Sequence, residues 1–140
     1  MRYWDASALV PLLLTEARTV QMQRRLGEDP VISTWTWTRV EIASAIERLH
    51  REGELSDTDR RTCFDQFAEM ALNWDEVVDS PAIRSRAIQL LRRHPLRAAD
   101  AAHLAAALWV AGDNPATLEF VCLDRRLVEA AEREGLSVVV

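Results

Sequence analysis

The feature that most restricts the fold of this chain is the alternation of short, continuously apolar segments with longer segments of helical periodicity. Continuous apolar runs are typical of parallel strands buried on both faces. We expect strands at residues 1–5, 31–33, 74–78, 120–123 and 137–140, and helices at 7–14, 17–26, 39–51, 56–73, 81–93, 97–111 and 125–134. The predicted fold is therefore a three-layer α/β/α sandwich around a central five-stranded, mainly parallel sheet.

Length and composition favour a single domain over residues 1–140, with no internal repeat or linker. Apolar residues make up 49% of the chain, enough for a working core. No apolar run is long enough to cross a membrane, and the first segment lacks the pattern of a signal peptide. Cys63 and Cys122 lie in apolar segments, which favours reduced, buried thiols over a disulfide. We therefore expect a cytoplasmic protein.

The net charge of −5 argues at first against a nucleic-acid partner. Total charge is a weak guide, however, when acids are concentrated where a metal ion binds. All 17 basic residues are arginines, and the planar guanidinium group suits phosphate. Several arginines occur in pairs, at 24–25, 60–61, 92–93 and 125–126, although any one pair can equally belong to a solvated helix face.

Four acids occupy the places where a parallel α/β sheet puts its ligands. Asp5 and Asp124 stand at the ends of predicted strands, and Glu41 and Asp100 stand in the opening turns of predicted helices. Each also has a purely structural explanation. Asp5 and Asp124 are suitable N-caps, Thr38 and Glu41 form a capping-box pattern, and Asp100 is favoured by the helix dipole.

The four acids together predict a metal site. All four are expected at the same edge of the sheet, where each pair of carboxylates about 5 Å apart would repel by about 3 kcal/mol at an effective dielectric of about 20. A divalent cation relieves that repulsion, and carboxylate oxygens are the hard ligands that Mg²⁺ and Mn²⁺ prefer. A phospho-acceptor receiver domain also places acids at strand ends, but it needs a lysine, and this chain has none.

Four segments resemble the motifs of PIN-domain proteins, in particular the VapC-type toxins of bacterial toxin–antitoxin pairs. These segments are YWDASAL at 3–9, TRVEIASA at 38–45, LRAADAAHLA at 96–105 and FVCLDRRL at 120–127. Their order, spacing and flanking residues all match, and the resemblance covers the whole chain. The third segment is the most specific.

The resemblance implies a ribonuclease that depends on Mg²⁺ or Mn²⁺. It makes Asp5, Glu41 and Asp100 metal ligands and Asp124 a further ligand or a supporting acid, with Ser7 holding a carboxylate or a water. It also implies an RNA substrate, a cognate antitoxin and a homodimer, and hydrolysis that leaves a 5′-phosphate and a 3′-hydroxyl. A nuclease directed to DNA or to a nucleic-acid structure, and a catalytically silent binding module, are the alternatives.

Several residues near these motifs have two interpretations. Arg97 can contact phosphate or orient an acid, or it can be an exposed arginine at a helix start. His103 can be a general base, but a packed, hydrogen-bonded histidine is commoner. Trp35 and Trp37 can stack on unpaired bases, or they can be packing or dimer-contact residues, and packing is favoured. For the antitoxin, we expect a tail that inserts an arginine or lysine among the acids, beside an apolar groove between helices 17–26 and 39–51.

Overall fold

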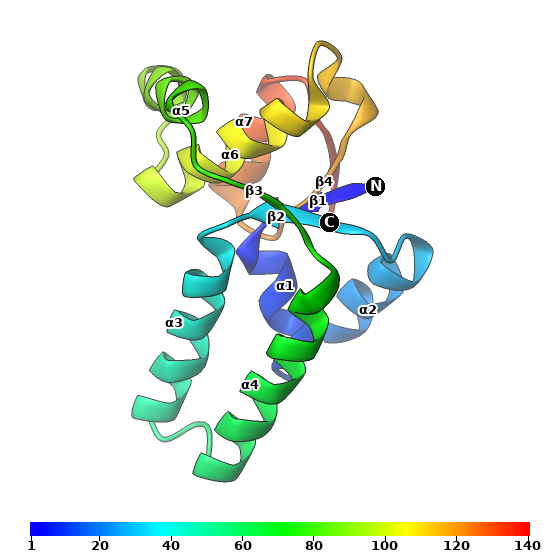
Figure 1. Ribbon diagram of the computed structural model, residues 1–140, viewed down its shortest axis with the longest axis vertical. Helices are drawn as coiled ribbons and strands as arrows, with labels where there is room; N and C mark the ends of the chain where they lie inside the picture. Colours follow the sequence, from blue (N-terminus) through cyan, green and yellow to red (C-terminus); the bar gives the residue numbers. More distant parts are fainter.

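The computed structural model describes residues 1–140 and contains a five-stranded, wholly parallel sheet (Figure 1). The strand order is β3-β2-β1-β4-β5. The strands are β1 (Arg2–Trp4), β2 (Ile32–Trp35), β3 (Asp75–Val77), β4 (Glu119–Val121) and β5 (Ser137–Val139). The predicted parallel α/β architecture is confirmed.

Seven α-helices and two short 3₁₀ helices cover the two faces of this sheet. They are α1 (Ala6–Leu13), α2 (Thr19–Glu28), α3 (Thr38–Arg51), α4 (Asp57–Met70), η1 (Ala71–Asn73), α5 (Pro81–Arg93), α6 (Ala98–Ala111), η2 (Pro115–Thr117) and α7 (Arg125–Arg133). Helices α1 to α4 lie on one face and α5 to α7 on the other (Figure 1). No helix is long and apolar enough to cross a membrane.

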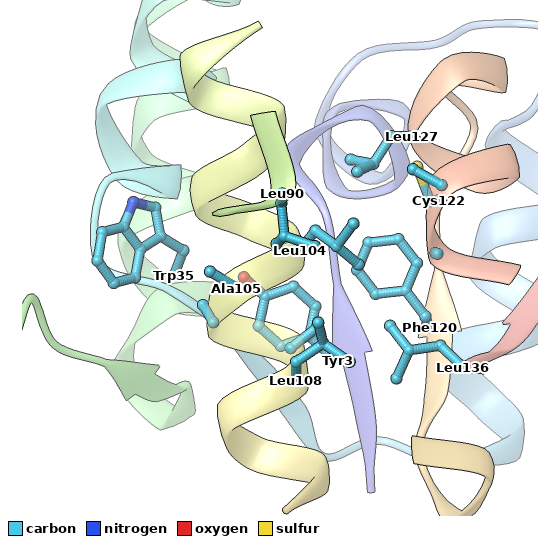
Figure 2. Packing of buried hydrophobic residues seen from close by; sticks show 14 of the residues in the cluster. Tyr3, Trp35, Leu90, Leu104, Ala105, Leu108, Phe120, Cys122, Leu127 and Leu136 are labelled. Carbon is cyan, nitrogen blue, oxygen red and sulfur yellow. The ribbon is translucent and has the colours of Figure 1, made fainter. Parts of the chain in front are cut away.

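The alternation of side chains along the strands creates a core on each face. Neighbouring residues of a strand point to opposite sides of the sheet. Tyr3 and Phe120 therefore pack with residues of α5, α6 and α7, as Figure 2 shows, whereas Trp4 and Val121 pack with residues of α1 to α4. Because both faces are covered, the strands need no polar side, and this explains their continuous apolar sequences.

The topology places the functional edge of the sheet between β1 and β4. The chain adds β2 and β3 on one side of β1, then crosses back to add β4 and β5 on the other. In open parallel sheets, ligands bind beyond the carboxyl ends of the strands at the point where the order reverses. Asp5 follows β1 directly, and Asp124 follows β4 after two intervening residues.

The element boundaries agree with prediction to within three residues, and the differences at α2 and β2 have clear physical reasons. Helix α2 was expected to stop at Gly27, but it continues to Glu28, because Gly27 does not adopt the positive φ that ends a helix. Strand β2 was expected to end at Ser33, but it extends to Trp35 because Thr34 and Trp35 pair with β3.

Candidate active site

Asp5 is held rigidly at the end of β1. Its backbone N–H donates to Val121 O at 3.0 Å, and its carboxylate caps α1 by accepting from the Ser7 N–H at 3.1 Å. The Ser7 hydroxyl also donates to Asp5 Oδ2 and in turn accepts the Leu123 N–H at 2.9 Å. Asp5 is only 4% exposed. Asp5 is therefore the N-cap of α1, as the structural interpretation predicted, and it also lies at the carboxyl edge of the sheet.

Glu41 does not belong to a capping box, contrary to that alternative. Helix α3 starts one residue earlier than expected, so Trp37 is the N-cap and no side chain caps this end. The Thr38 hydroxyl is instead 2.8 Å from Thr34 Oγ1, which donates to Trp4 O at 2.7 Å. The carboxylate of Glu41 is thereby free to contact His103, whose Nε2 lies 2.9 Å from Glu41 Oε1.

Asp100 sits in the first turn of α6, where the Arg97 N–H donates to its Oδ2 at 3.3 Å. Burial raises the pKa of the Asp100 carboxyl; the Arg97 hydrogen bond opposes this shift, and the charges of Asp124 and Asp5 add to it. The hydrogen bond from Arg97 therefore lowers the pKa of Asp100, whereas the nearby like charges raise it.

Asp124 is the N-cap of α7, and its Oδ1 accepts the Leu127 N–H at 3.0 Å. The structural interpretation of this acid is thus also correct. A carboxylate has two oxygens, so the cap leaves Oδ2 for another partner. Asp124 is partly exposed, as are Glu41 and Asp100.

The four acids line one cleft of about 250 Å³. The complete lining is Asp5, Ser7, Glu41, Arg97, Ala99, Asp100 and Asp124. Four different elements supply the carboxylates: the end of β1, the first turns of α3 and α6, and the start of α7. The structure thus brings together every residue that the sequence suggested for the site, with the exposed Arg97 at its rim.

His103 lies behind this cleft and is completely buried. Its Nε2 faces Glu41 Oε1 at 2.9 Å and Asp5 Oδ1 at 3.4 Å, and its Nδ1 is 3.1 Å from the Tyr3 hydroxyl. Burial opposes protonation of the imidazole, but Asp5, Glu41 and Asp100 outweigh it and raise the pKa of His103. The hydrogen-bonded interpretation of this histidine is correct.

Sequence reasoning missed the contact between Cys122 and Asp5. The thiol is completely buried and donates to Asp5 Oδ2 over an Sγ–Oδ2 distance of 3.4 Å. Burial and the charge of Asp5 raise the pKa of Cys122, so the residue stays a neutral thiol donor. The only sequence signal for this role is its position two residues before Asp124, at the end of an apolar strand.

The residues of the cleft fit a divalent cation. The carboxylate oxygens of Asp5 and Glu41 lie within 4.8 Å of each other, and the Nε2 of the buried His103 behind the cleft lies within the same distance of both. Burial and, to a smaller extent, the charges of Asp124 and Asp5 raise the pKa of Asp100, and a cation in the cleft would favour its ionised form. A set of several carboxylate oxygens is typical of sites for hard divalent ions.

The two tryptophans beside Glu41 have different environments. Trp35 is 6% exposed and packs in the core, whereas Trp37 is 57% exposed at the start of α3. Packing within the chain is therefore correct for Trp35 but not for Trp37, for which base stacking and a dimer contact are the remaining interpretations. The alternation of β2 buries Trp35, and the turn that follows the strand carries Trp37 outward.

The predicted groove between helices 17–26 and 39–51 is wrong. Helix α2 packs against α1, and α3 packs against α1 and α4. Figure 1 shows α2 and α3 well apart, with α1 between them. Any apolar groove for a partner must therefore be formed by other helix pairs.

Comparison with known proteins agrees with this fold. No family model matches the chain. Two curated relatives, Ribonuclease VapC45 and Ribonuclease VapC49, both from Mycobacterium tuberculosis, are each 31% identical over 97% of this chain and 92% of their own length.

Solved structures with the same fold include a toxin–antitoxin complex from Klebsiella pneumoniae, at 20% identity and a TM-score of 0.67, covering 100% of this chain and 97% of that chain. FitAcB from Neisseria gonorrhoeae has 13% identity and a TM-score of 0.74 over the same shares. The five-stranded parallel sheet with its seven α-helices matches the PIN-domain fold of these toxin–antitoxin structures. With relatives at this level of identity, the chain belongs to the VapC family of PIN-domain ribonucleases.

Proposed function

We propose that this protein is a metal-dependent endoribonuclease that acts as the toxin of a toxin–antitoxin pair. The observation that carries the proposal is the cleft in which Asp5, Glu41, Asp100 and Asp124 converge. The relatives named as ribonucleases support RNA as the substrate, and the toxin–antitoxin complex with the same fold supports a toxin role.

In this proposal, Asp5, Glu41 and Asp100 bind Mg²⁺ or Mn²⁺. Asp124 adds a ligand through the oxygen that does not cap α7, or supports one of the other three acids. Ser7 fixes Asp5 through its hydroxyl. A bound divalent cation supplies an acidified water and neutralises charge on the scissile phosphate. Arg97, exposed at the rim, is placed to bind a neighbouring phosphate through its guanidinium group.

The test is a cleavage assay on total RNA and on single- and double-stranded DNA, with Mg²⁺, Mn²⁺ or a chelator. We expect RNA to be cut only when a metal is present, leaving 5′-phosphate and 3′-hydroxyl ends. Preferential cutting of DNA would favour a DNA-directed nuclease. Cleavage that persists in chelator, or that leaves 2′,3′-cyclic phosphates, would refute the metal-dependent hydrolysis.

The proposed partners are a cognate antitoxin and a second copy of the chain. An acidic cleft is readily blocked by a cation, so we expect an antitoxin tail that places an arginine or lysine among the four acids. In the same assay, the protein copurified with the product of a small neighbouring reading frame should be inactive. Light scattering of the free protein should give the mass of a dimer.

The exposed Trp37 is expected to contribute to RNA binding. It begins the helix whose first turn carries Glu41, and an indole stacking on an unpaired base is worth about 1–3 kcal/mol. Trp37→Ala, measured in a cleavage-deficient Asp100→Asn background, should therefore weaken binding of single-stranded RNA by roughly 5- to 150-fold.

The matched control for this variant is Trp109→Ala. Trp109 is similarly exposed, at 61%, but it lies in the C-terminal half of α6, away from the acidic cleft. Equal weakening by both substitutions would show that Trp37 has no special part in RNA binding.

A further inference from the structure

The buried His103 joins two of the carboxylates that the proposed function assigns to the metal. Its Nε2 is 2.9 Å from Glu41 Oε1 and 3.4 Å from Asp5 Oδ1. Carboxylate oxygens can only accept hydrogen bonds, so the proton on this side of the ring belongs to Nε2. His103 therefore donates its hydrogen bond to Glu41, in the first turn of α3, and lies within ion-pair distance of Asp5, at the end of β1.

Tyr3 holds the imidazole ring from the other side. Its hydroxyl lies 3.1 Å from His103 Nδ1, and its side chain is completely buried. The ring of Tyr3 stacks on Phe120 and meets the imidazole edge-on, and Figure 2 shows it packed in the core beside α6. Because side chains two apart on a strand share a face, Tyr3 lies on the same side of β1 as Asp5.

The position of His103 separates it from the residues that contact the cleft. Asp5, Glu41, Asp100 and Asp124 all line the cleft, whereas the imidazole does not and is completely shielded from solvent. A side chain placed behind two carboxylates, with its proton directed at Glu41 and its ring close to Asp5, supports their relative orientation. It does not present a lone pair to an ion in the cleft.

We propose that His103 is a positioning residue that fixes the spacing and orientation of the Asp5 and Glu41 carboxylates, with Tyr3 fixing the imidazole in turn. The inference rests on the proposed metal-dependent function. Without the imidazole between them, the two acids would repel each other, and the Glu41 carboxylate would be free to turn away from Asp5, which Ser7 holds in place. Hydrogen-bond partners of this kind typically change metal affinity or activity by about 10- to 100-fold.

The experiment measures Mn²⁺ binding by calorimetry, with no RNA present. His103→Leu removes the donor at similar volume and should weaken Mn²⁺ binding by about 10- to 100-fold. His103→Gln retains an N–H donor and should recover part of the affinity. Tyr3→Phe removes only the hydroxyl and should weaken binding in the same direction, but less than His103→Leu does.

The control is His94→Gln. His94 is another buried histidine bonded to a glutamate, with its Nε2 2.7 Å from Glu134 Oε1, but it does not line the cleft. This change should leave Mn²⁺ affinity unaltered. Circular dichroism at the assay temperature identifies any variant that is unfolded. If His103→Leu fails to fold, the Gln and Phe variants carry the test.

Two results would overturn the inference. One is an unchanged Mn²⁺ affinity in folded His103 and Tyr3 variants. The other is a ¹⁴N coupling of a directly bound imidazole in pulsed electron paramagnetic resonance of the Mn²⁺-loaded protein, which would make His103 a ligand. Neither result contradicts the proposed nuclease function if the wild-type protein still cuts RNA in the presence of metal. A wild-type protein that binds no Mn²⁺ would refute both the role of His103 and the metal-dependent nuclease function.

Discussion

Asp5→Asn and Asp100→Asn are each expected to reduce RNA cleavage by more than about 100-fold. Loss of a group that only supports a metal ligand costs about 10- to 100-fold, so loss of a ligand charge should cost at least as much. Asparagine has nearly the same volume as aspartate and retains one oxygen. That oxygen can still accept the Ser7 N–H at position 5 or the Arg97 N–H at position 100.

The measurement is single-turnover cleavage of RNA in saturating Mg²⁺, together with circular dichroism to show that the fold persists. Asp113→Asn is the matched control, because it makes the same chemical change just beyond the opposite end of α6, at an exposed residue away from the cleft. This control should cleave at the wild-type rate. If Asp5→Asn or Asp100→Asn cleaves RNA at the wild-type rate, the substituted acid is not a metal ligand.

The second large effect concerns stability without RNA. A divalent ion that binds only the folded protein stabilises it by about 2.7 kcal/mol at 100 times its Kd, which raises the Tm by roughly 8 °C for a chain of this size. Thermal melting of the wild-type protein in chelator and in millimolar Mn²⁺ should show this shift. Asp100→Asn should show a much smaller one, because it lacks a ligand charge.

In chelator, Asp100→Asn should melt higher than the wild-type protein. Burial and the charges of Asp124 and Asp5 raise the pKa of Asp100, so ionisation of this side chain destabilises the metal-free fold. The wild-type protein should therefore lose stability as pH rises from the ordinary carboxyl range through that raised pKa. Because Asp100 is partly exposed, solvent screening limits the gain to on the order of 1 kcal/mol, about 3 °C.

The helix-capping role of Asp100 predicts the opposite sign. If its carboxylate mainly serves the α6 dipole, Asp100→Asn should cost about 0.3–1 kcal/mol and melt lower in chelator. A lower Tm combined with an undiminished Mn²⁺ shift would place the metal elsewhere. Asp113→Asn again provides the baseline for removing one negative charge.

The parallel α/β fold could be predicted from the sequence because its signals are local. Continuous apolar strands such as the one around Phe120, and helices such as Pro81–Arg93 with proline in the first turn, specify their own conformation. Parallel strands also align their carboxyl ends, so acids placed after β1 and β4 had to share one edge. That rule is why Asp5 and Asp124 could be assigned to a common site from their positions alone.

Other features depended on contacts between residues distant in sequence, which no local pattern encodes. The Thr38–Glu41 capping box was a reasonable prediction, but Thr34 competes for the Thr38 hydroxyl and Glu41 turns to His103. The approach of Cys122 to Asp5 and of Tyr3 to His103 likewise exists only because β1, β4 and α6 pack together. The sequence by itself determined the layered sheet and the edge at which the four acids gather. Tertiary packing alone decided which buried donors hold those acids, because such hydrogen bonds form between side chains that only the folded chain brings within reach.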